Sequence, residues 1–288
     1  MQKDSKNLGE RKRRKIVRRL FVIFVAAIFL LLIIPLIKIY IFKPGRLEVD
    51  YLNIGQGDSE LIKTPDHKLV LIDGGPDNLV LNRLGEVLPF YRRKIDYLIL
   101  SHYHDDHATG LIEVIKRYQV KNLIYSNKRQ SELLDNLLKV AQDNKVRITP
   151  LANSAKIDLE KDCFLNILNP ESLKIPDDQN NSLVTKLDCD KNSFLFAGDN
   201  SLIVERYLLK SNFNLKADVL KASHHGSKTA NSEVFLKAVN PTDFVISDGI
   251  NNKFNLPSPE IVERAQGLGL KIFRTDQQGT IRIFGVFH

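Results

Sequence analysis

The chain has 288 residues, of which 43% are hydrophobic and 26% are charged, an ordinary balance for a globular protein. Its formal net charge of +8 is unevenly distributed, because residues 1–43 carry eleven Lys and Arg against two acidic residues, and the remainder carries 31 basic and 32 acidic residues. The high charge therefore gives no support for a globally basic, nucleic-acid-binding domain. Short basic runs at Arg92–Lys94 and Lys128–Arg129 remain candidates for a local patch, although such runs more often form solvated surface.

The N-terminal segment predicts a membrane anchor. Residues 1–19 form a basic tail, which we expect to be disordered up to the start of a helix. Leu20–Ile37 is an apolar run of 18 residues, which as a helix spans about 27 Å, close to the hydrocarbon thickness of a bilayer. No small-residue cleavage site follows, so an uncleaved anchor is favoured over a signal peptide or a buried soluble helix. The preceding positive charges place the N-terminus in the cytoplasm and the C-terminal part outside the cytoplasmic membrane.

Residues 46–288 predict one layered α/β domain, with sheets inside and helices outside. We thus divide the chain into a basic tail (1–19), a transmembrane anchor (20–42) and a single large domain (46–288). Alternation and apolar runs predict strands at 47–51, 61–63, 68–72, 95–100, 122–125, 146–148, 163–168, 182–187, 194–197, 218–221, 244–246, near 272, and at 281–284. Helical patterns follow Leu79 and Gly110, cover 131–142, 202–209 and 232–239, and begin after the N-cap and N1 pair Ser258–Pro259.

The two cysteines, Cys163 and Cys189, lie in segments that predict neighbouring strands. An oxidising compartment would permit a bridge between them. The sequence alone leaves open whether they form one.

The stretch SHYHDDHATG, residues 101–110, indicates a metal site. It lies between a buried strand and an amphipathic helix. Since side chains at i and i+2 of an extended chain point the same way, His102 and His104 can face one cation. Asp106 and His107 follow as the chain curls into the helix and can face a second cation. Imidazole and carboxylate at this density are typical ligands of zinc.

Three further segments place metal-type side chains directly after predicted strands. Asp73 ends LVLIDGG, Asp199 ends FLFAGD, and His224 and His225 lie in LKASHHGS. Asp199 alone could equally be a helix N-cap. Five of the seven histidines fall in two such loops, which favours the metal interpretation for the whole set.

These motifs, in this order, resemble the metallo-β-lactamase superfamily, and within it the metallo-β-lactamase-like domain of ComEC-type competence proteins. The resemblance covers essentially all of residues 46–288 and rests on NIGQGDSELI, LIDGG, LSHYHDDHATGL, NNSLV, FLFAGD, VLKASHHGSKT and FRTDQQGTI. It implies an αββα sandwich and one or two bound divalent cations, zinc or manganese.

The resemblance also implies a role for each candidate residue. His102 and His104 would bind one metal, Asp106 and His107 the other, and Asp199 would bridge them. His224 or His225 would complete the second site, and Asp73 would orient a ligand imidazole. Asp106 would accept a proton from the attacking water, and the histidine of the pair that is not a ligand would protonate the leaving oxygen.

The chain departs from the family pattern at three places. Asn181 and Ser182 stand where the wider superfamily supplies another histidine, which leaves the first site poorer in ligands. Leu256 stands where members of the subgroup commonly carry a histidine before the proline. One apolar span replaces the multi-span channel of ComEC-type transporters, so we expect a stand-alone, membrane-tethered relative of the hydrolase domain.

The resulting expectation is a membrane-anchored, metal-dependent phosphodiesterase or nuclease linked to DNA uptake or processing, with single-stranded DNA as the candidate substrate. Two alternatives remain open: a cell-envelope phosphoesterase of phosphorylcholine or teichoic-acid type, and a non-catalytic metal-binding accessory module. A β-lactam hydrolase is the least favoured. Protein partners are not indicated.

Overall fold

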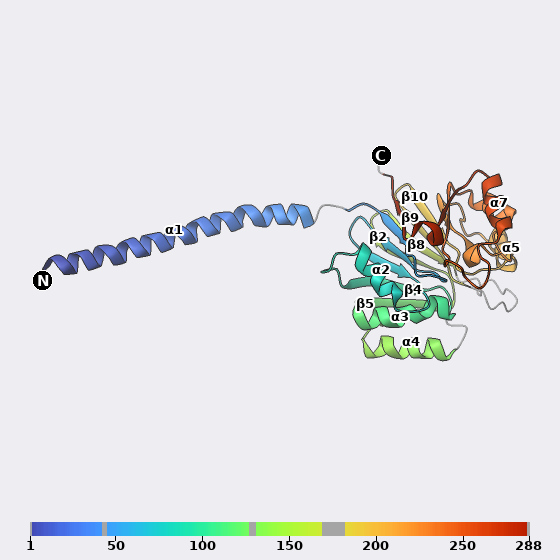
Figure 1. Ribbon diagram of the computed structural model, residues 1–288, viewed down its shortest axis with the longest axis horizontal. Helices are drawn as coiled ribbons and strands as arrows, with labels where there is room; N and C mark the ends of the chain where they lie inside the picture. The colour runs from blue at the N-terminus through green and yellow to red at the C-terminus, as the bar shows by residue number, and fades with distance from the viewer. Residues whose placement is uncertain (1, 42–44, 127–130, 169–181, 287–288) are drawn as a thin grey trace. The chain divides into compact units, whose positions relative to one another are not determined.

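The computed structural model describes residues 2–41, 45–126, 131–168 and 182–286 (Figure 1). It divides the chain into two compact units, Met1–Gly45 and Arg46–His288. The first unit contains one helix, α1, Gln2–Ile41. The expectation of a disordered basic tail was therefore wrong, since the helix already begins at Gln2. The physical reason is that Lys, Arg and Glu, which dominate this tail, all have high helix propensity.

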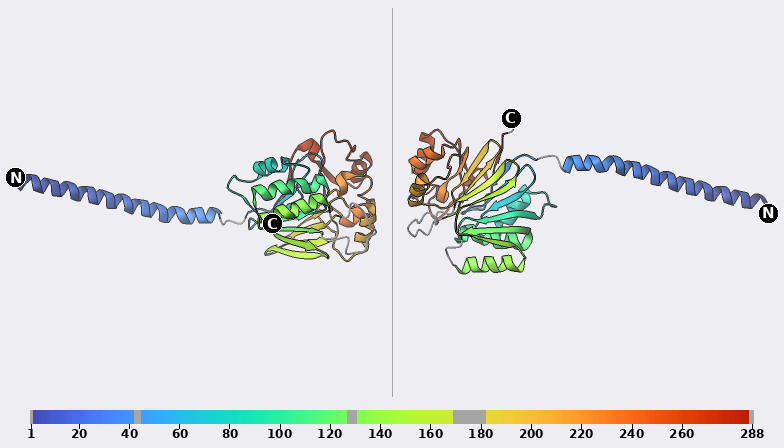
Figure 2. Two further views of the ribbon diagram at one scale, coloured as in Figure 1. Left: turned by 90° about the horizontal axis from the view of Figure 1, so that it is seen from below. Right: turned by 180° about the vertical axis from the view of Figure 1, so that it is seen from behind.

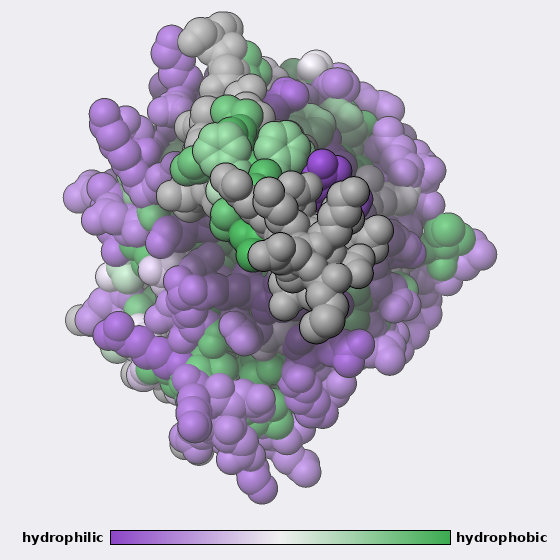
Figure 3. Space-filling model, turned by 90° about the vertical axis from the view of Figure 1, so that its left-hand side faces the viewer, coloured by the Kyte–Doolittle hydropathy of each residue, from purple (hydrophilic) through white to green (hydrophobic). Residues whose placement is uncertain are grey.

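Helix α1 carries the apolar segment found in the sequence. Residues Arg14–Ile33 have a mean hydropathy of 2.7 and are 0% buried, and by length and composition this is the one helix of the described chain that could cross a membrane. Phe21, Phe24 and Phe29 are each more than 60% exposed. Much of the surface seen in Figure 3 is hydrophilic, with hydrophobic residues confined to a few separate patches. The phenylalanines of α1 therefore require an apolar phase or a partner to cover them.

The second unit is built from two seven-stranded sheets that stack face to face, with helices on the outer faces (Figures 1 and 2). This confirms the predicted layered α/β fold. The first sheet has the order β14 (Ile281–Phe284), β1 (Glu48–Tyr51), β2 (Glu60–Lys63), β3 (Leu69–Ile72), β4 (Lys94–Leu100), β5 (Gln119–Ser126) and β6 (Arg147–Leu151). The second has the order β13 (Lys271–Arg274), β12 (Asp243–Ile246), β11 (Val219–Lys221), β10 (Asn192–Phe196), β9 (Val184–Cys189), β8 (Cys163–Leu168) and β7 (Ala155–Glu160).

The helices of the second unit form two groups that are consecutive in the sequence. The first group is α2 (Leu79–Val87), α3 (Asp105–Arg117) and α4 (Glu132–Asp143), and the second is α5 (Leu202–Lys210), α6 (Glu233–Val239), α7 (Pro259–Gly267) and α8 (Thr275–Gln278). A 3₁₀ turn, Ser223–Gly226, follows β11. Strand β7 and the short helix α8 are elements that the sequence patterns did not predict. Helix α8 is only four residues long and too short to show helical periodicity. Strand β7, AKIDLE, does alternate apolar and polar residues, so its signal was present in the sequence and was missed.

Three apolar cores hold these layers together. Strand β4 contributes to two of these cores. Leu98 and Leu100 face the core beneath α2–α4, and Ile99 between them faces the core between the two sheets. A third core lies beneath α5–α7 and is centred on Phe235 and Phe244. Alternate side chains of a strand point to opposite faces, so both faces of each central strand are buried.

The strand directions determine where a site can form. Strands β3–β6 run parallel in the first sheet, and β10–β13 run parallel in the second. The remaining pairs are antiparallel. Loops that follow parallel strands gather at one edge of a sheet. The predicted metal residues all lie in such loops or in the first helical turn that follows them, after β3, β4, β10 and β11.

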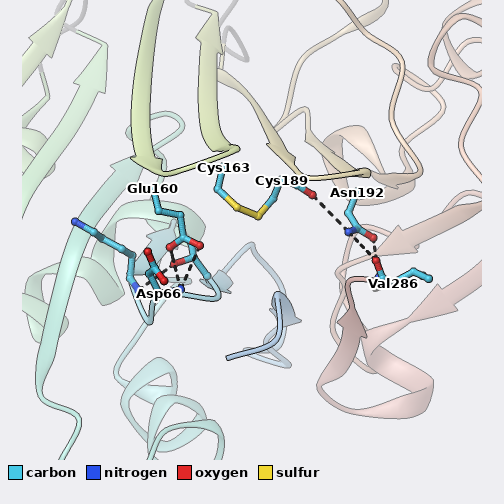
Figure 4. Close-up of a disulfide and its surroundings, with 8 residues drawn as sticks. Asp66, Glu160, Cys163, Cys189, Asn192 and Val286 are labelled. Carbon is cyan, nitrogen blue, oxygen red and sulfur yellow. Dashed lines mark hydrogen bonds between the residues drawn. A yellow bond between two sulfur atoms is a disulfide. The ribbon is translucent and has the colours of Figure 1, made fainter. Parts of the chain in front are cut away.

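The two cysteines form a disulfide between adjacent strands (Figure 4). Cys163 of β8 and Cys189 of β9 are direct partners in the strand register, and their Cα atoms are 4.0 Å apart. Beside them, Glu160 accepts a hydrogen bond of 3.0 Å from the backbone N–H of Asp66 in the β2–β3 turn. The second sheet is thereby joined to the first close to the disulfide.

Candidate metal centre

The loop after β4 carries the densest group of predicted ligands. It ends where α3 begins, with His104 at the N-cap and Asp105 and Asp106 in the first turn, where carboxylates interact favourably with the helix dipole. Nε2 of His102 lies 2.9 Å from Nδ1 of His104. The two imidazoles are therefore adjacent, and their binding of one cation stays a prediction.

The loop after β3 passes unusually close to α3. The backbone N–H of Gly74 donates to the carbonyl of His107 at 2.7 Å. A Cβ atom on Gly110 would lie 1.9 Å from the carbonyl oxygen of Gly74, so only glycine permits this approach. The DGG and HATG motifs are thus two halves of one contact, and the contact places Asp73 directly beneath His107.

Asp73 orients two imidazoles of the α3 loop. Its Oδ2 lies 2.8 Å from Nδ1 of His107 and accepts a 2.5 Å hydrogen bond from the Ser101 hydroxyl. That hydroxyl lies 3.1 Å from Nδ1 of His102. With Nδ1 engaged in each ring, both histidines present Nε2 to the site. Burial raises the pKa of Asp73, while His107 and Ser101 oppose this shift.

The loops of the second sheet supply the opposite wall of the site. Asp199 follows β10, and its backbone N–H donates to the hydroxyl of buried Ser182 at 2.9 Å. His225 follows β11, and its Nδ1 lies 3.0 Å from the carbonyl oxygen of Ser247. His224 and His225 both have positive φ, 49° and 53°. Such backbone costs about 1–3 kcal/mol per residue and is concentrated at functional sites.

Four of the predicted residues converge on one point: Asp106, His107, Asp199 and His225, whose ligand atoms all lie within 4.8 Å of one another. The Asp199 carboxylate lies between the two histidines, 3.5 Å from Nε2 of His107 and 3.6 Å from Nε2 of His225. Both Nε2 atoms, and Oδ1 of Asp199, are buried without a hydrogen-bond partner among the described residues. Buried polar atoms are rarely left unpaired, so this set fits a divalent cation, which would satisfy all of them.

Two other predicted ligands, His102 and His224, lie beside this set, with their Nε2 atoms at longer distances from its Asp199 carboxylate. Nε2 of His102 is 3.9 Å from Oδ2 of Asp199, and Nε2 of His224 is 4.0 Å from the same oxygen. His224 is half-buried, with Nδ1 at 3.3 Å from the Thr229 hydroxyl. Asn181 lies outside the described residues. Of the adjacent histidines, His225 therefore joins the four-residue set, and His224 lies at its rim.

Sequence reasoning assigned no role to a buried pair beneath the site, Asp58 and Lys221. The Lys221 ammonium donates to Oδ2 of Asp58, and Oδ1 of Asp58 lies 3.3 Å from Nδ1 of His225. Although burial would raise it, Lys221 and His225 lower the pKa of Asp58 to about 2. The signal was present in the sequence, since Asp58 ends the GQGD motif and Lys221 precedes HHGS.

Three histidines of the site carry strongly shifted pKa values. Burial would lower them, but Asp199 and Asp58 raise the pKa of His225 to about 10, and Asp199 and Asp73 raise that of His107 well above its usual value. Burial lowers the pKa of His102 well below its usual value. The cluster of carboxylates thus concentrates positive charge at His107 and His225, the position at which a cation would bind.

A cleft of about 830 Å³ opens beside the metal-type residues. His104 and Asp106 form part of its wall, together with the aromatic rings of Tyr103 and Phe254 and the ammonium of Lys253. Phe254 is 54% exposed. The cleft thus offers apolar surface and aromatic faces next to the candidate metal site, and its charged lining consists of Asp77, Asp105 and Asp106 with Lys253.

Fold and site together define an αββα metallohydrolase-type protein, and the sequence family agrees. Residues 52–247 match the family model of the metallo-beta-lactamase superfamily, so the chain belongs to this superfamily. Within it, the chain is similar to ComEC-type competence proteins: it is 32% identical over 272 residues to ComE operon protein 3 of Bacillus subtilis, covering 88% of this chain and 34% of that protein. It is 30% identical over 234 residues to competence protein ComA of Neisseria gonorrhoeae, covering 81% and 31%.

The chain spans about a third of the length of these curated relatives. Among solved structures it resembles the metallo-beta-lactamase fold protein YhfI of Bacillus subtilis, with a TM-score of 0.60, 12% identity, and coverage of 84% of this chain and all of that one. At this identity the likeness shows the fold alone.

Proposed function

We propose that this chain is a metal-dependent phosphodiesterase of the ComEC-like group that cleaves single-stranded DNA during DNA uptake or processing. The observation that carries the proposal is the convergence of Asp106, His107, Asp199 and His225, of which the last three each have a buried polar atom without a hydrogen-bond partner among the described residues. Nitrogen and oxygen donors in this combination favour zinc, with manganese as the other candidate. His102 and His104 would hold a second ion.

A bound divalent cation supplies a nucleophilic water near neutral pH and neutralises the charge that develops on phosphoryl oxygens. The protein's own groups do the rest. Asp106 has a 31% exposed side chain that reaches the cleft, so it can accept the proton of an attacking water. Burial lowers the pKa of His224 at the rim of the site. An anionic phosphodiester beside it would raise that pKa again, which would allow His224 to protonate the leaving oxygen.

We further propose that α1 anchors the protein in the cytoplasmic membrane with residues 46–288 outside. Three observations support this: the exposed apolar segment Arg14–Ile33, the basic residues before it, and the disulfide between Cys163 and Cys189. Structural disulfides persist in oxidising compartments and are rare in the cytosol.

The test is cleavage by the purified full chain in detergent, after metal removal and again after addition of zinc or manganese. Substrates are a single-stranded oligonucleotide, a chromogenic phosphodiester and a choline-phosphate ester. Asp199→Asn should abolish metal-dependent turnover, and His67→Ala, which changes an exposed histidine far from the site, should leave it unchanged.

Preference for the choline-phosphate ester would instead support a cell-envelope phosphoesterase, which the near-neutral charge of residues 44–288 also favours. Bound metal with no turnover of any ester would refute the enzymatic proposal and support an accessory module.

A further inference from the structure

Exposed aromatic and basic side chains follow helix α2. In the α2–β4 connection Phe90 is 85% exposed and Tyr91 is 71% exposed; among the described large hydrophobic residues of the second unit, only Ile250 equals Tyr91 and none equals Phe90. Their rings stack edge to face with centroids 5.5 Å apart. Arg92, Arg93 and Lys94 follow at once in the sequence. We call Phe90–Lys94 the aromatic–basic loop.

This loop lies where the chain enters the second unit. Nζ of Lys63 bonds to Oε1 of Glu48 at 2.7 Å and to the carbonyl oxygen of Val87, at the end of α2, at 2.8 Å. One ammonium thus joins the first residue of β1 to the helix that precedes the aromatic–basic loop. Arg46, two residues before β1, lies over the ring of Phe284 at 4.2 Å, and Phe284 is the register partner of Glu48. The loop and the chain entry therefore share one end of the first sheet.

The charge at this end is positive. Among the described residues, Arg92, Arg93 and Lys94 form no ion pair within 4.0 Å of a carboxylate. Lys121 lies on the neighbouring strand β5 and lowers the pKa of Lys94. Lys121 itself forms an ion pair with Asp96 at 2.5 Å. Of the acidic groups at this end, Glu48 and Asp96 are paired with lysines. The exposed Asp66 of the β2–β3 turn adjoins His67, whose carbonyl oxygen accepts a hydrogen bond from Arg92, and the loop's three cations outnumber it. A surface with an excess of cations attracts anions.

Covalent connection keeps this end near the anchor. Only residues 42–45 separate the last residue of α1, Ile41, from Arg46. Five Cα–Cα steps span at most roughly 18 Å. If α1 crosses a bilayer, Arg46 therefore stays within that reach of the lipid headgroups. The aromatic–basic loop lies at the same end of the first sheet, before β4, three strands from β1.

We propose that the aromatic–basic loop is a membrane-contact surface that binds anionic lipid and holds the hydrolase domain in one orientation on the bilayer. The inference rests on the proposed membrane attachment of α1. Aromatic rings favour the headgroup region of a bilayer, and clustered Lys and Arg bind anionic lipid headgroups. A membrane fits better than nucleic acid because two large aromatic side chains stand exposed beside the basic residues, and the chain at this end of the sheet leads to the anchor.

The orientation has a consequence for the site. Strand β4 runs from Lys94, at the loop, to Leu100, next to His102. Seven residues of strand span about 23 Å. The metal centre and its cleft follow the far ends of β3 and β4, so a docked domain presents the site away from the bilayer and toward a soluble polymer.

The natural sequence contains no Trp, so Phe90→Trp introduces a single fluorescent reporter into the full chain. The chain is placed in lipid nanodiscs of phosphatidylcholine, with or without phosphatidylglycerol, and with acyl chains that are brominated or not. We expect a blue-shifted emission in anionic discs and quenching by the brominated lipid. Val234→Trp, at a 65% exposed position on α6, is the matched control and should show neither effect.

A second pair of variants tests the charge. Arg93→Gln with Lys94→Gln in the Phe90→Trp chain should lower the ratio of docked to undocked domain roughly fivefold for each charge removed. Lys210→Gln with Lys216→Gln removes the same charge from exposed positions elsewhere and should leave the ratio unchanged. Equal quenching at positions 90 and 234 in protein retained by the discs would overturn the proposal.

Two other results would also overturn it, and they are distinguishable. A response of the Phe90→Trp reporter to a single-stranded oligonucleotide, without quenching by brominated lipid, would identify a nucleic-acid surface instead. Failure of the full chain to co-elute with nanodiscs would refute the membrane anchor, and this inference with it, while leaving the metal-dependent activity untouched.

Discussion

Lys221 and Asp58 form an ion pair beneath the metal centre in which each side chain is only 1% exposed. Asp58 also faces His225, and His225 faces Asp106 and Asp199. The Lys221 ammonium thus neutralises Asp58, and Asp58 in turn contacts His225, one of the candidate metal ligands. Burying two charges is costly, and the pair is stable only because each charge has its partner.

Lys221→Met leaves the Asp58 carboxylate buried without its counter-ion. We expect a loss of about 3–5 kcal/mol in the free energy of unfolding, measured by urea denaturation of the metal-free chain. Zinc affinity should fall as well, because Asp58 no longer has a fixed position against His225. Adding Asp58→Asn should recover part of the stability.

Lys186→Met is the control for this prediction, since Lys186 is a buried lysine paired with Asp188 at 3.0 Å on the second sheet, away from the site. It should lower stability but leave zinc affinity unchanged. Equal zinc affinity in the Lys221→Met and natural chains would show that the pair supports only the fold.

The two adjacent histidines should differ sharply in metal binding. His225→Ala removes a member of the four-residue set and should weaken zinc binding more than about 100-fold, beyond the range typical of residues that only support ligands. His224→Ala should weaken it less than about tenfold, because His224 lies at the rim. Competition with a chromogenic chelator measures both. A larger loss for His224→Ala than for His225→Ala would reverse the assignment.

Metal binding should release protons. The pKa of His225 is raised to about 10 and that of His107 is raised well above its usual value, so both rings are protonated at pH 7 in the metal-free protein. Ligand imidazoles must be neutral. Zinc affinity should therefore rise from pH 6 to pH 9, and calorimetry in buffers of different ionisation enthalpy should count the released protons. Affinity that is independent of pH would contradict this.

The same two histidine pKa shifts should make the metal-free protein less stable as the pH rises, whereas they make zinc binding tighter. A histidine pKa raised above its unfolded value of about 6.5 contributes stability that is present below that pH and is lost as the pH rises toward the folded value. The melting temperature of the metal-free chain should fall between pH 6.5 and pH 10, and the increase caused by zinc should grow over the same range. Thermal unfolding with and without a chelator measures both effects.

The disulfide should stabilise the second sheet by restricting the unfolded chain. Cys163 and Cys189 are 26 residues apart, and closing a loop of that size is worth about 3.5 kcal/mol in the chain-entropy model. Replacing both by Ser should lower the free energy of unfolding by that amount in urea titrations. Reductant should destabilise the natural chain to the same level and have no effect on the double variant.

The sequence by itself determined the residue types of the site and the secondary structure that carries them. The i, i+2 spacing of His102 and His104 and the boundaries of β8 and β14 depend on local periodicity, which side-chain direction imposes within a single strand. The close approach of the DGG and HATG loops also left a local signal in the form of glycine.

Only the tertiary structure decided which side chains meet. That His225 rather than His224 joins Asp106 depends on two consecutive left-handed residues after β11, and the Asp58–Lys221 pair joins residues 163 positions apart across both sheets. The bond between Cys163 and Cys189 depends on the register of β8 against β9. Register and stacking are set by the packing of all three cores at once, so no local pattern of residues records them.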